Sequence, residues 1–120
     1  MSDQDDLAGA PGPTRFPRLF SPLQLGPLQI RNRIFSSGHD TVMGENGLIG
    51  DRLIAYQRAR AAGGAGLIIV QVASVHKSAE YTAHALSAMD DTCIPGYRRI
   101  AEAVHAEGAA VIGQVFHGGR

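Results

Sequence analysis

The 120-residue sequence has one cysteine, no tryptophan and no excess of either charge. A lone Cys93 cannot form an internal disulfide, and without a Cys-x-x-Cys pair the sequence lacks the ligand pattern of zinc and iron–sulfur sites. Eleven basic residues balance eleven acidic ones, so no net charge attracts the chain to nucleic acid or to a membrane surface. These absences predict a cytoplasmic protein with no nucleic-acid or membrane partner and no bound metal, and any other partner has to be argued from local sites.

Long apolar runs are also absent from the first 18 residues, which read MSDQDDLAGAPGPTRFPR. This segment matches neither a signal peptide nor a membrane span. Its Asp, Pro and Gly content predicts a flexible leader over residues 1–18. We expect residues 19–120 to fold, because the whole chain is 44% hydrophobic and 18% charged, as ordinary globular proteins are.

What the sequence does contain is a regular alternation of apolar runs and amphipathic segments. Leu19–Ile30 has two apolar stretches around the turn signal Gly26-Pro27, which predicts a β-hairpin. Asp51 is the expected N-cap of the first helix that follows. The patterns predict strands at 33–37, 66–72 and 109–116, helices at 51–62 and 97–107, and long loops at 38–50 and 73–92.

Strands that alternate with helices of this length predict right-handed βαβ units and a parallel sheet. The run Gly66–Val72 is apolar except for Gln71, as in parallel strands covered on both faces. An open nucleotide-binding sheet would carry a Gly-x-Gly-x-x-Gly turn after its first strand, whereas Gly38–Gly50 is thirteen residues long and has none. The predicted fold is therefore α/β, the opening portion of a (β/α)₈ barrel, incomplete in this chain because such barrels need about 250 residues.

Four sequence blocks carry a resemblance to a known family, in the family's order and at compatible spacing. They are LFSP at 19–22, LQIRNRI at 28–34, RARAAGGAGLII at 58–69 and QVFHGGR at 114–120. Together they resemble the N-terminal part of the old yellow enzyme family of NADH:flavin oxidoreductases, nearest the branch of 2,4-dienoyl-CoA reductase and trimethylamine dehydrogenase. The resemblance implies that residues 19–120 are the N-terminal part of an FMN-binding barrel.

The resemblance places the end of the first strand along the flavin. Ser37, Gly38 and His39 would face the isoalloxazine edge, where small residues let a flat ring approach the backbone. Asp40 stands where the family often has a hydroxyl or a thiol that bonds the flavin carbonyl. A carboxylate is unfavourable beside a reduced, anionic flavin, so Asp40 is expected to turn away, to pair with His39 or to leave the donor role to Thr41. A solvated loop residue is the alternative interpretation of Asp40.

Three residues on the later strands complete the implied cofactor site. Gln114 interrupts an apolar strand, where a buried amide needs a partner, and it matches the family's glutamine that bonds the flavin pyrimidine edge. Val72 takes a position that the family fills with Ala or Gly, so its branched side chain would crowd the ring. Arg120 follows the third strand and would meet the flavin or an anionic substrate, or else pair with neighbouring loops. Gln71 is expected to be structural.

The implied activity is that of an FMN-dependent oxidoreductase. It would move hydride or electrons between NADH or NADPH and an organic substrate, such as an activated alkene or an enoyl thioester. The family's usual proton donor and substrate anchors have no counterpart here, and an iron–sulfur cluster and FAD would belong to a C-terminal part outside this chain. The alternative is a truncated, non-catalytic half-barrel that works only with a complementary chain or as a binding module. The 120 residues alone are expected to be inactive.

Overall fold

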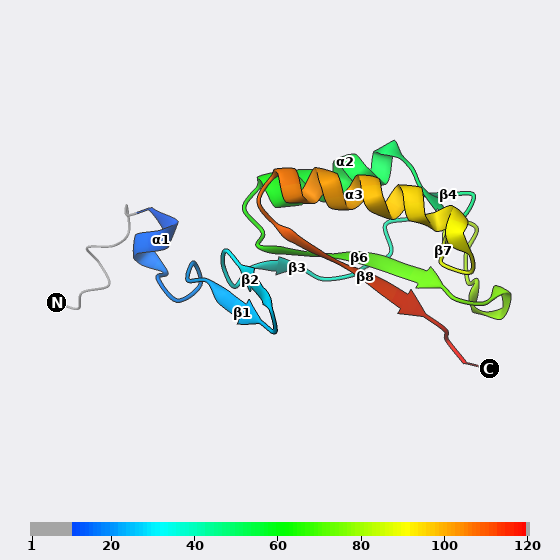
Figure 1. Ribbon diagram of the computed structural model, residues 1–120, viewed down its shortest axis with the longest axis horizontal. Helices are drawn as coiled ribbons and strands as arrows, with labels where there is room; N and C mark the ends of the chain where they lie inside the picture. Colours follow the sequence, from blue (N-terminus) through cyan, green and yellow to red (C-terminus); the bar gives the residue numbers. More distant parts are fainter. Residues whose placement is uncertain (1–10, 120) are drawn as a thin grey trace.

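The computed structural model describes residues 11–119 and has one main sheet covered by helices. Strands β3 (Phe35–Ser36), β6 (Leu67–Ser74) and β8 (Ala110–Phe116) run parallel, with β6 in the middle. Helices α2 (Asp51–Ala62) and α3 (Ile94–Ala106) connect them and lie side by side on one face of the sheet (Figure 1). The predicted β-α-β-α-β order and the parallel pairing are therefore confirmed.

The chain before the sheet forms two small elements. Strands β1 (Leu23–Leu25) and β2 (Leu28–Ile30) pair antiparallel around Gly26, whose φ of 56° suits the turn, and this confirms the predicted hairpin. Within the predicted leader, α1 (Gly12–Arg15) is a single helical turn with no buried residue. Residues 1–10 lie outside the described residues, so the leader remains a prediction.

The predicted loop over residues 38–50 contains a hairpin of its own. Strands β4 (Gly44–Glu45) and β5 (Leu48–Ile49) pair antiparallel, and the turn between them has φ angles of 52° at Asn46 and 78° at Gly47. The prediction of a plain loop is wrong here, because an Asn-Gly pair favours a tight two-residue hairpin turn.

The predicted loop over residues 73–92 is also partly ordered. It includes two short 3₁₀ turns, η2 (Lys77–Ala79) and η3 (Asp91–Cys93), and the strand β7 (Leu86–Ser87) between them. Strand β7 pairs in parallel with the end of β6. A two-residue strand has no periodicity of its own, so only this long-range pairing reveals it.

The N-cap of α2 and the first residue of α3 differ from the prediction. Gly50 is the N-cap of α2, and Asp51 is the first helical residue, where its carboxylate makes no capping hydrogen bond and pairs with Arg99 instead. The predicted Asp51 cap is therefore wrong. An acidic side chain in the first turn still interacts favourably with the positive end of the helix dipole. Helix α3 begins at Ile94, with Pro95 in its first turn, where a missing N–H breaks no hydrogen bond.

The hydrophobic core lies between the two helices and the sheet. Residues of α2, α3 and β6 dominate it, and each large side chain that it buries contributes about 1.5–3 kcal/mol. Its two clusters contain Ile49, Leu53, Val70, Ala73, Leu86 and Ile100, and Ala61, Ile68, Val104 and Ala109.

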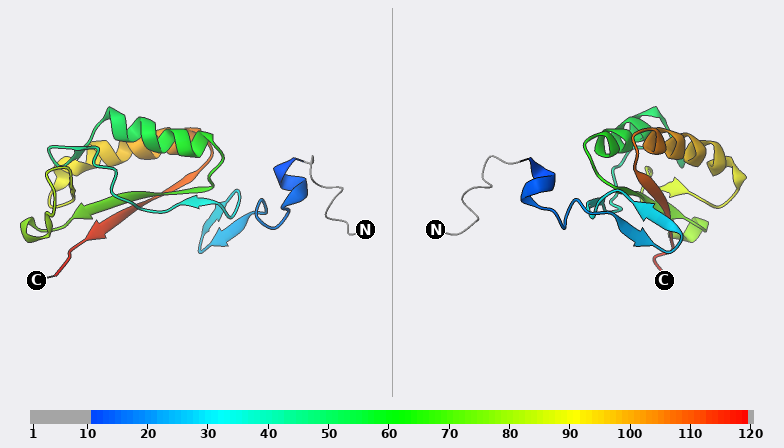
Figure 2. Two further views of the ribbon diagram at one scale, coloured as in Figure 1. Left: turned by 180° about the vertical axis from the view of Figure 1, so that it is seen from behind. Right: turned by 60° about the vertical axis from the view of Figure 1, so that its left-hand side comes forward.

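The opposite side of the sheet, called the open face below, carries no helix among the described residues (Figure 2). Val111 packs against the core, so the alternation of side chains along β8 directs Ile112 and Gln114 to the open face. Ile112 is 44% exposed there. Coverage on both faces is predicted only for residues 66–72, and β8 is left uncovered on its open face by the described residues.

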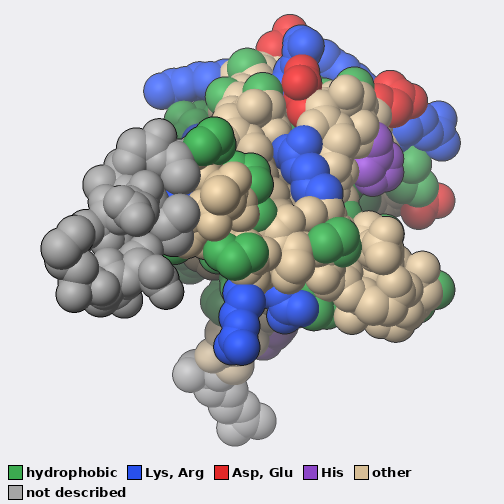
Figure 3. Space-filling view, turned by 90° about the vertical axis from the view of Figure 1, so that its left-hand side faces the viewer, with side chains coloured by type: hydrophobic (Ala, Val, Ile, Leu, Met, Phe, Trp, Pro, Cys, Tyr) green, Lys and Arg blue, Asp and Glu red, His purple; other side chains and the backbone are tan. Residues whose placement is uncertain are grey.

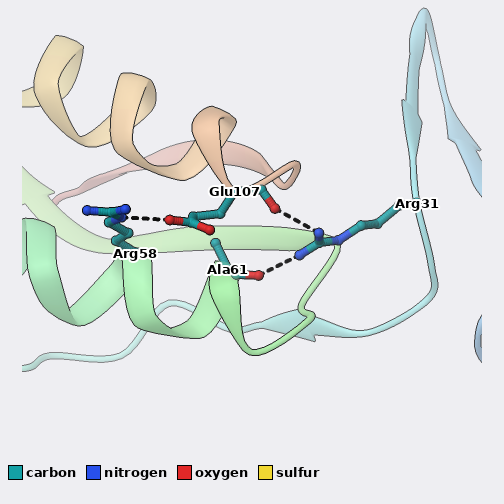
Figure 4. A network of polar contacts seen from close by, with 4 residues as sticks. All are labelled: Arg31, Arg58, Ala61 and Glu107. Carbon is teal, nitrogen blue, oxygen red and sulfur yellow. Dashed lines mark hydrogen bonds and ion pairs between the residues drawn. The ribbon is translucent and has the colours of Figure 1, made fainter. Parts of the chain in front are cut away.

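An arginine ties the hairpin segment to the ends of both helices (Figure 4). Arg31 donates hydrogen bonds to the backbone carbonyls of Glu107 at 2.7 Å, of Ala61 at 2.5 Å and of Ala65 at 2.8 Å. Ala61 belongs to the last turn of α2, and Glu107 caps α3, so one cation meets the negative ends of two helix dipoles. The Glu107 carboxylate also pairs with Arg58 at 2.7 Å.

Seen from the hairpin side, acidic and basic side chains are interspersed over the helix layer (Figure 3). This distribution agrees with the zero net charge of the sequence. Within residues 11–119, no helix has the length and the apolar character that a bilayer span needs.

Candidate functional site

Four of the predicted cofactor residues lie toward the C-terminal ends of three neighbouring parallel strands. Ser37 and Gly38 follow β3 directly, while Val72 is in β6 and Gln114 is in β8. Val72, which is half-buried, and Gln114 are register partners, just beyond a register shift that begins after Ile69. Because the carboxyl ends of parallel strands meet at one edge of a sheet, the fold brings these residues together.

Gly38 and Gln114 are in direct contact. A Cβ atom built on Gly38 would overlap Oε1 of Gln114, and it would lie 3.2 Å from both the carbonyl oxygen of Val70 and Cγ2 of Ile69. The absence of a side chain at residue 38 therefore lets the backbone after β3 pass close to the Gln114 amide.

Gln114 is exposed, and its expected burial is wrong for the described residues. By the alternation of side chains along β8, Gln114 points to the open face. No described helix covers this face (Figure 2). Among residues 11–119 the Gln114 amide forms no hydrogen bond, so both a donor and an acceptor are free. A flat ring with N–H and C=O groups alternating along its edge would complement the donor and the acceptor of this amide. The pyrimidine ring of a flavin has such an edge.

His39 is bound to helix α2 rather than to Asp40. Its Nδ1 lies 2.9 Å from the carbonyl oxygen of Ser37, and its Nε2 lies 2.5 Å from the hydroxyl of Tyr56. The Arg60 guanidinium stacks 3.4 Å from the centroid of the Tyr56 ring and donates to the same hydroxyl. The imidazole is thus engaged, and the expected pairing of His39 with Asp40 is not formed.

Asp40 is held by three hydrogen-bond donors, although the residue as a whole is exposed. Its carboxylate accepts from the N–H of Val42 at 3.0 Å, from Nε2 of Gln71 at 3.3 Å and from the hydroxyl of Tyr81 at 3.1 Å. Burial raises the pKa of the Tyr81 phenol, and the bond and charge of Asp40 raise it further, so the phenol remains protonated as a donor. The Thr41 hydroxyl donates to Gln71 and is not free.

The loops after β6 and β8 bring two histidines to one serine. The Ser78 hydroxyl lies 2.8 Å from Nδ1 of His76 and 3.0 Å from Nε2 of His117. Sequence patterns miss this cluster because His117 lies 39 residues from Ser78 in the chain. No group of three or more His, Cys, Asp or Glu within residues 11–119 is arranged to hold a metal ion. Arg120, the remaining predicted contact, lies outside the described residues.

Three clefts in the described part of the chain are lined by residues other than Ser37, Gly38, Val72 and Gln114. Two of them, of about 520 and about 470 Å³, border the β4–β5 hairpin and share Asn46 and Ala83. Another, of about 570 Å³, lies along α2 beside Glu107. Gly38, Val72 and Gln114 therefore lie outside these clefts, and Gln114 is exposed on the open face.

Comparison with known proteins identifies relatives over most of the chain. The model of the NADH:flavin oxidoreductase / NADH oxidase family matches residues 18–120. A metal reductase from Desulforamulus reducens is 44% identical over 103 residues, which are 85% of this chain and 15% of that protein. An NADH oxidase from Thermoanaerobacter brockii is 42% identical over 109 residues, which are 89% of this chain and 17% of that protein. The chain thus spans less than a fifth of the length of these relatives.

Solved structures agree with the family match. A 2-naphthoyl-CoA reductase in complex with 2-naphthoyl-CoA superposes with a TM-score of 0.83 at 31% identity, over 86% of this chain and 16% of that one. The old yellow enzyme from Trypanosoma cruzi superposes with a TM-score of 0.77 at 30% identity, over 88% of this chain and 28% of that one. Old yellow enzymes are (β/α)₈ barrels, so the predicted fold class is confirmed. The chain belongs to the NADH:flavin oxidoreductase / NADH oxidase family.

Proposed function

We propose that this chain forms one side of an FMN site in an oxidoreductase that transfers hydride or electrons between a nicotinamide cofactor and an organic substrate. The observation that carries the proposal is the contact of Gly38 with Gln114 where the chain leaves β3 and passes β8. Bound FMN would supply the chemistry of accepting and donating hydride. The residues of this chain would bind and orient it.

Each residue has a distinct part in this proposal. The Gln114 amide donates to and accepts from the pyrimidine edge of the flavin, because both its donor and its acceptor are free. The bare backbone at Gly38 lets the ring lie against the strand end, with Ser37 beside it. Val72 limits the approach of the ring to β6, since a β-branched side chain is stiff. His39 contributes its backbone, because its imidazole is bound to α2.

The reductant and the substrate follow from the family rather than from these residues. A nicotinamide donor is supported by relatives that are an NADH oxidase and NADPH dehydrogenases. We propose an activated alkene or an enoyl thioester as the substrate, and the match to a 2-naphthoyl-CoA reductase favours the thioester. An iron–sulfur cluster and FAD, as in the 2,4-dienoyl-CoA reductase branch, would lie outside these 120 residues. A cytoplasmic location is part of the same proposal.

The absorbance spectrum of the purified full-length product tests the proposal. We expect flavin bands that stay with the protein through gel filtration. Additional iron–sulfur absorption would support the 2,4-dienoyl-CoA reductase branch. A colourless protein that takes up no FMN on titration would overturn the proposal and favour a binding module or a half-barrel that needs a complementary chain.

A further inference from the structure

Gln71 is buried in β6, and both ends of its amide are bonded to the loop after β3. Its Oε1 accepts from the N–H of Thr41 at 3.2 Å and from the Thr41 hydroxyl, and its Nε2 donates to Oδ1 of Asp40 at 3.3 Å. Gln71 is 0% exposed and Thr41 is 9% exposed, so water does not compete for the bonds between them. Removal of the amide would leave buried polar groups of the loop without partners.

The path of β6 explains why Gln71 reaches this loop. The register of β6 with β8 shifts between Ile69 and Val72, so β6 has one more residue than β8 over this interval. An irregularity of this kind redirects a side chain relative to a regular strand. Here it returns Val72 to register with Gln114 and leaves Gln71 against the loop.

The loop residues that Gln71 holds directly follow the segment proposed to contact the flavin. Ser37–His39 directly precede Asp40 in the chain. When hydrogen bonds hold Asp40 and Thr41 in place, they also fix the position of this segment beside β6. The Gln71 bond also restrains the Asp40 carboxylate, together with the bonds from Val42 and from Tyr81. A negative charge that is held in place is less free to approach the flavin, whose reduced form is an anion.

We propose that Gln71 is a positioning residue for the flavin site, which acts through Thr41 and Asp40 and touches neither flavin nor substrate. An amide suits this position because it accepts from Thr41 while it donates to Asp40. A glutamate would keep only the acceptor, and a leucine would have neither group. This inference rests on the proposed function.

Dissociation constants for FMN, measured on the full-length product, test the inference. We expect Gln71→Leu to weaken FMN binding about tenfold, because a misplaced loop loses contacts with the ring. Thr41→Val, which removes only the hydroxyl, should weaken it about threefold. The double variant should bind like Gln71→Leu, because both changes break the same bonds. Thr41→Ser keeps the hydroxyl and should bind like the unmodified protein.

Ser74→Ala is the matched control. Ser74 is also buried in β6, and its hydroxyl donates to the carbonyl oxygen of Ala79 at 3.1 Å. Its removal costs a buried hydrogen bond in the same strand but leaves the loop after β3 untouched. We therefore expect a loss of stability with no change in FMN affinity.

Amide hydrogen exchange provides a readout that does not depend on flavin. In the flavin-free protein, the Thr41 N–H should exchange faster in Gln71→Leu than in the unmodified protein, because it loses its acceptor. Ser74→Ala should leave that exchange rate unchanged. If Gln71→Leu does not fold, Thr41→Val and Thr41→Ser carry the test.

The outcomes separate the inference from the function on which it rests. FMN affinity that is equal in the unmodified protein, in Gln71→Leu and in Thr41→Val would overturn the inference and leave the proposed function standing. An equal loss of affinity in Ser74→Ala would also overturn it, because any polar change in β6 would then have the same effect. Unmodified protein that binds no FMN would overturn both.

Discussion

The two faces of the central sheet differ in what covers them. On the helix side, Leu53, Ile68 and Ile100 are at most 1% exposed and form a packed core. On the open face, Ile112 is 44% exposed and Gln114 is exposed as well. Under the proposed function, folding and cofactor binding would depend on different residues of the same strands. Substitutions on one face should therefore change stability, and substitutions on the other should change FMN binding.

The largest expected effect is the loss of tight FMN binding when residues 1–120 are expressed alone, because the open face then has nothing to cover it. Residues 1–120 expressed alone should bind FMN with a dissociation constant above about 1 μM, or less than about 8 kcal/mol of binding free energy. The candidate residues would contact the flavin ring from one side only, and the phosphate site of (β/α)₈ barrels usually lies after strands 7 and 8. Fluorescence titration with FMN measures this. Stoichiometric, submicromolar binding by a monomer would show that the open face is a complete site.

The helix side is tested by Leu53→Ala. The truncation leaves a cavity in the core beside Val70, so the free energy of unfolding should fall by about 2–5 kcal/mol. Denaturant unfolding of the full-length product measures it. Leu48→Ala is the control, because Leu48 is 39% exposed and should lose less than about 1 kcal/mol. Equal losses in the two variants would contradict the assignment of the core.

A smaller loss of stability is expected from Arg31→Met. The change keeps most of the side-chain length but removes the donors that bond the carbonyls of Ala61 and Glu107. Because Arg31 is exposed and water can replace part of these bonds, the loss should be about 1–2 kcal/mol in denaturant unfolding. Arg52→Met, on the exposed surface of α2, should change stability by less than about 0.5 kcal/mol. If Arg31→Met lost no more stability than Arg52→Met, the hydrogen bonds from Arg31 to the helix ends would not contribute as expected.

Much of the helix side is predictable from the sequence, because periodicity reports it directly. The apolar run at 67–72 and the helical spacing of Ile100 and Val104 place β6 and α3 correctly. Periodicity does not predict the short strands. The strands β4 and β5 are indicated only by the turn at Asn46-Gly47, and β7 is indicated only by its pairing with β6. Local patterns do not contain that long-range pairing.

The candidate site is predictable in its location but not in its details. Parallel strand order is enough to bring Gly38 and Gln114 to one edge of the sheet. The exposure of Gln114 depends on what lies over the open face, which the pattern of β8 does not state. Two of the three partners of Asp40, Gln71 and Tyr81, are far away in the sequence, so the alternatives for its carboxylate stay open until the fold is known.

The central claim is that the open face carries the flavin site, and Gln114→Leu tests it most directly. In the full-length product, the loss of the amide should cost about 1–3 kcal/mol of FMN binding, or about 5- to 150-fold in affinity. The free energy of unfolding should stay within about 0.5 kcal/mol, because the side chain is exposed. Gln29→Leu, at an exposed glutamine of the β1–β2 hairpin, is the matched control and should retain FMN fully. FMN content after dialysis that is equal in Gln114→Leu, Gln29→Leu and the unmodified protein would contradict the claim.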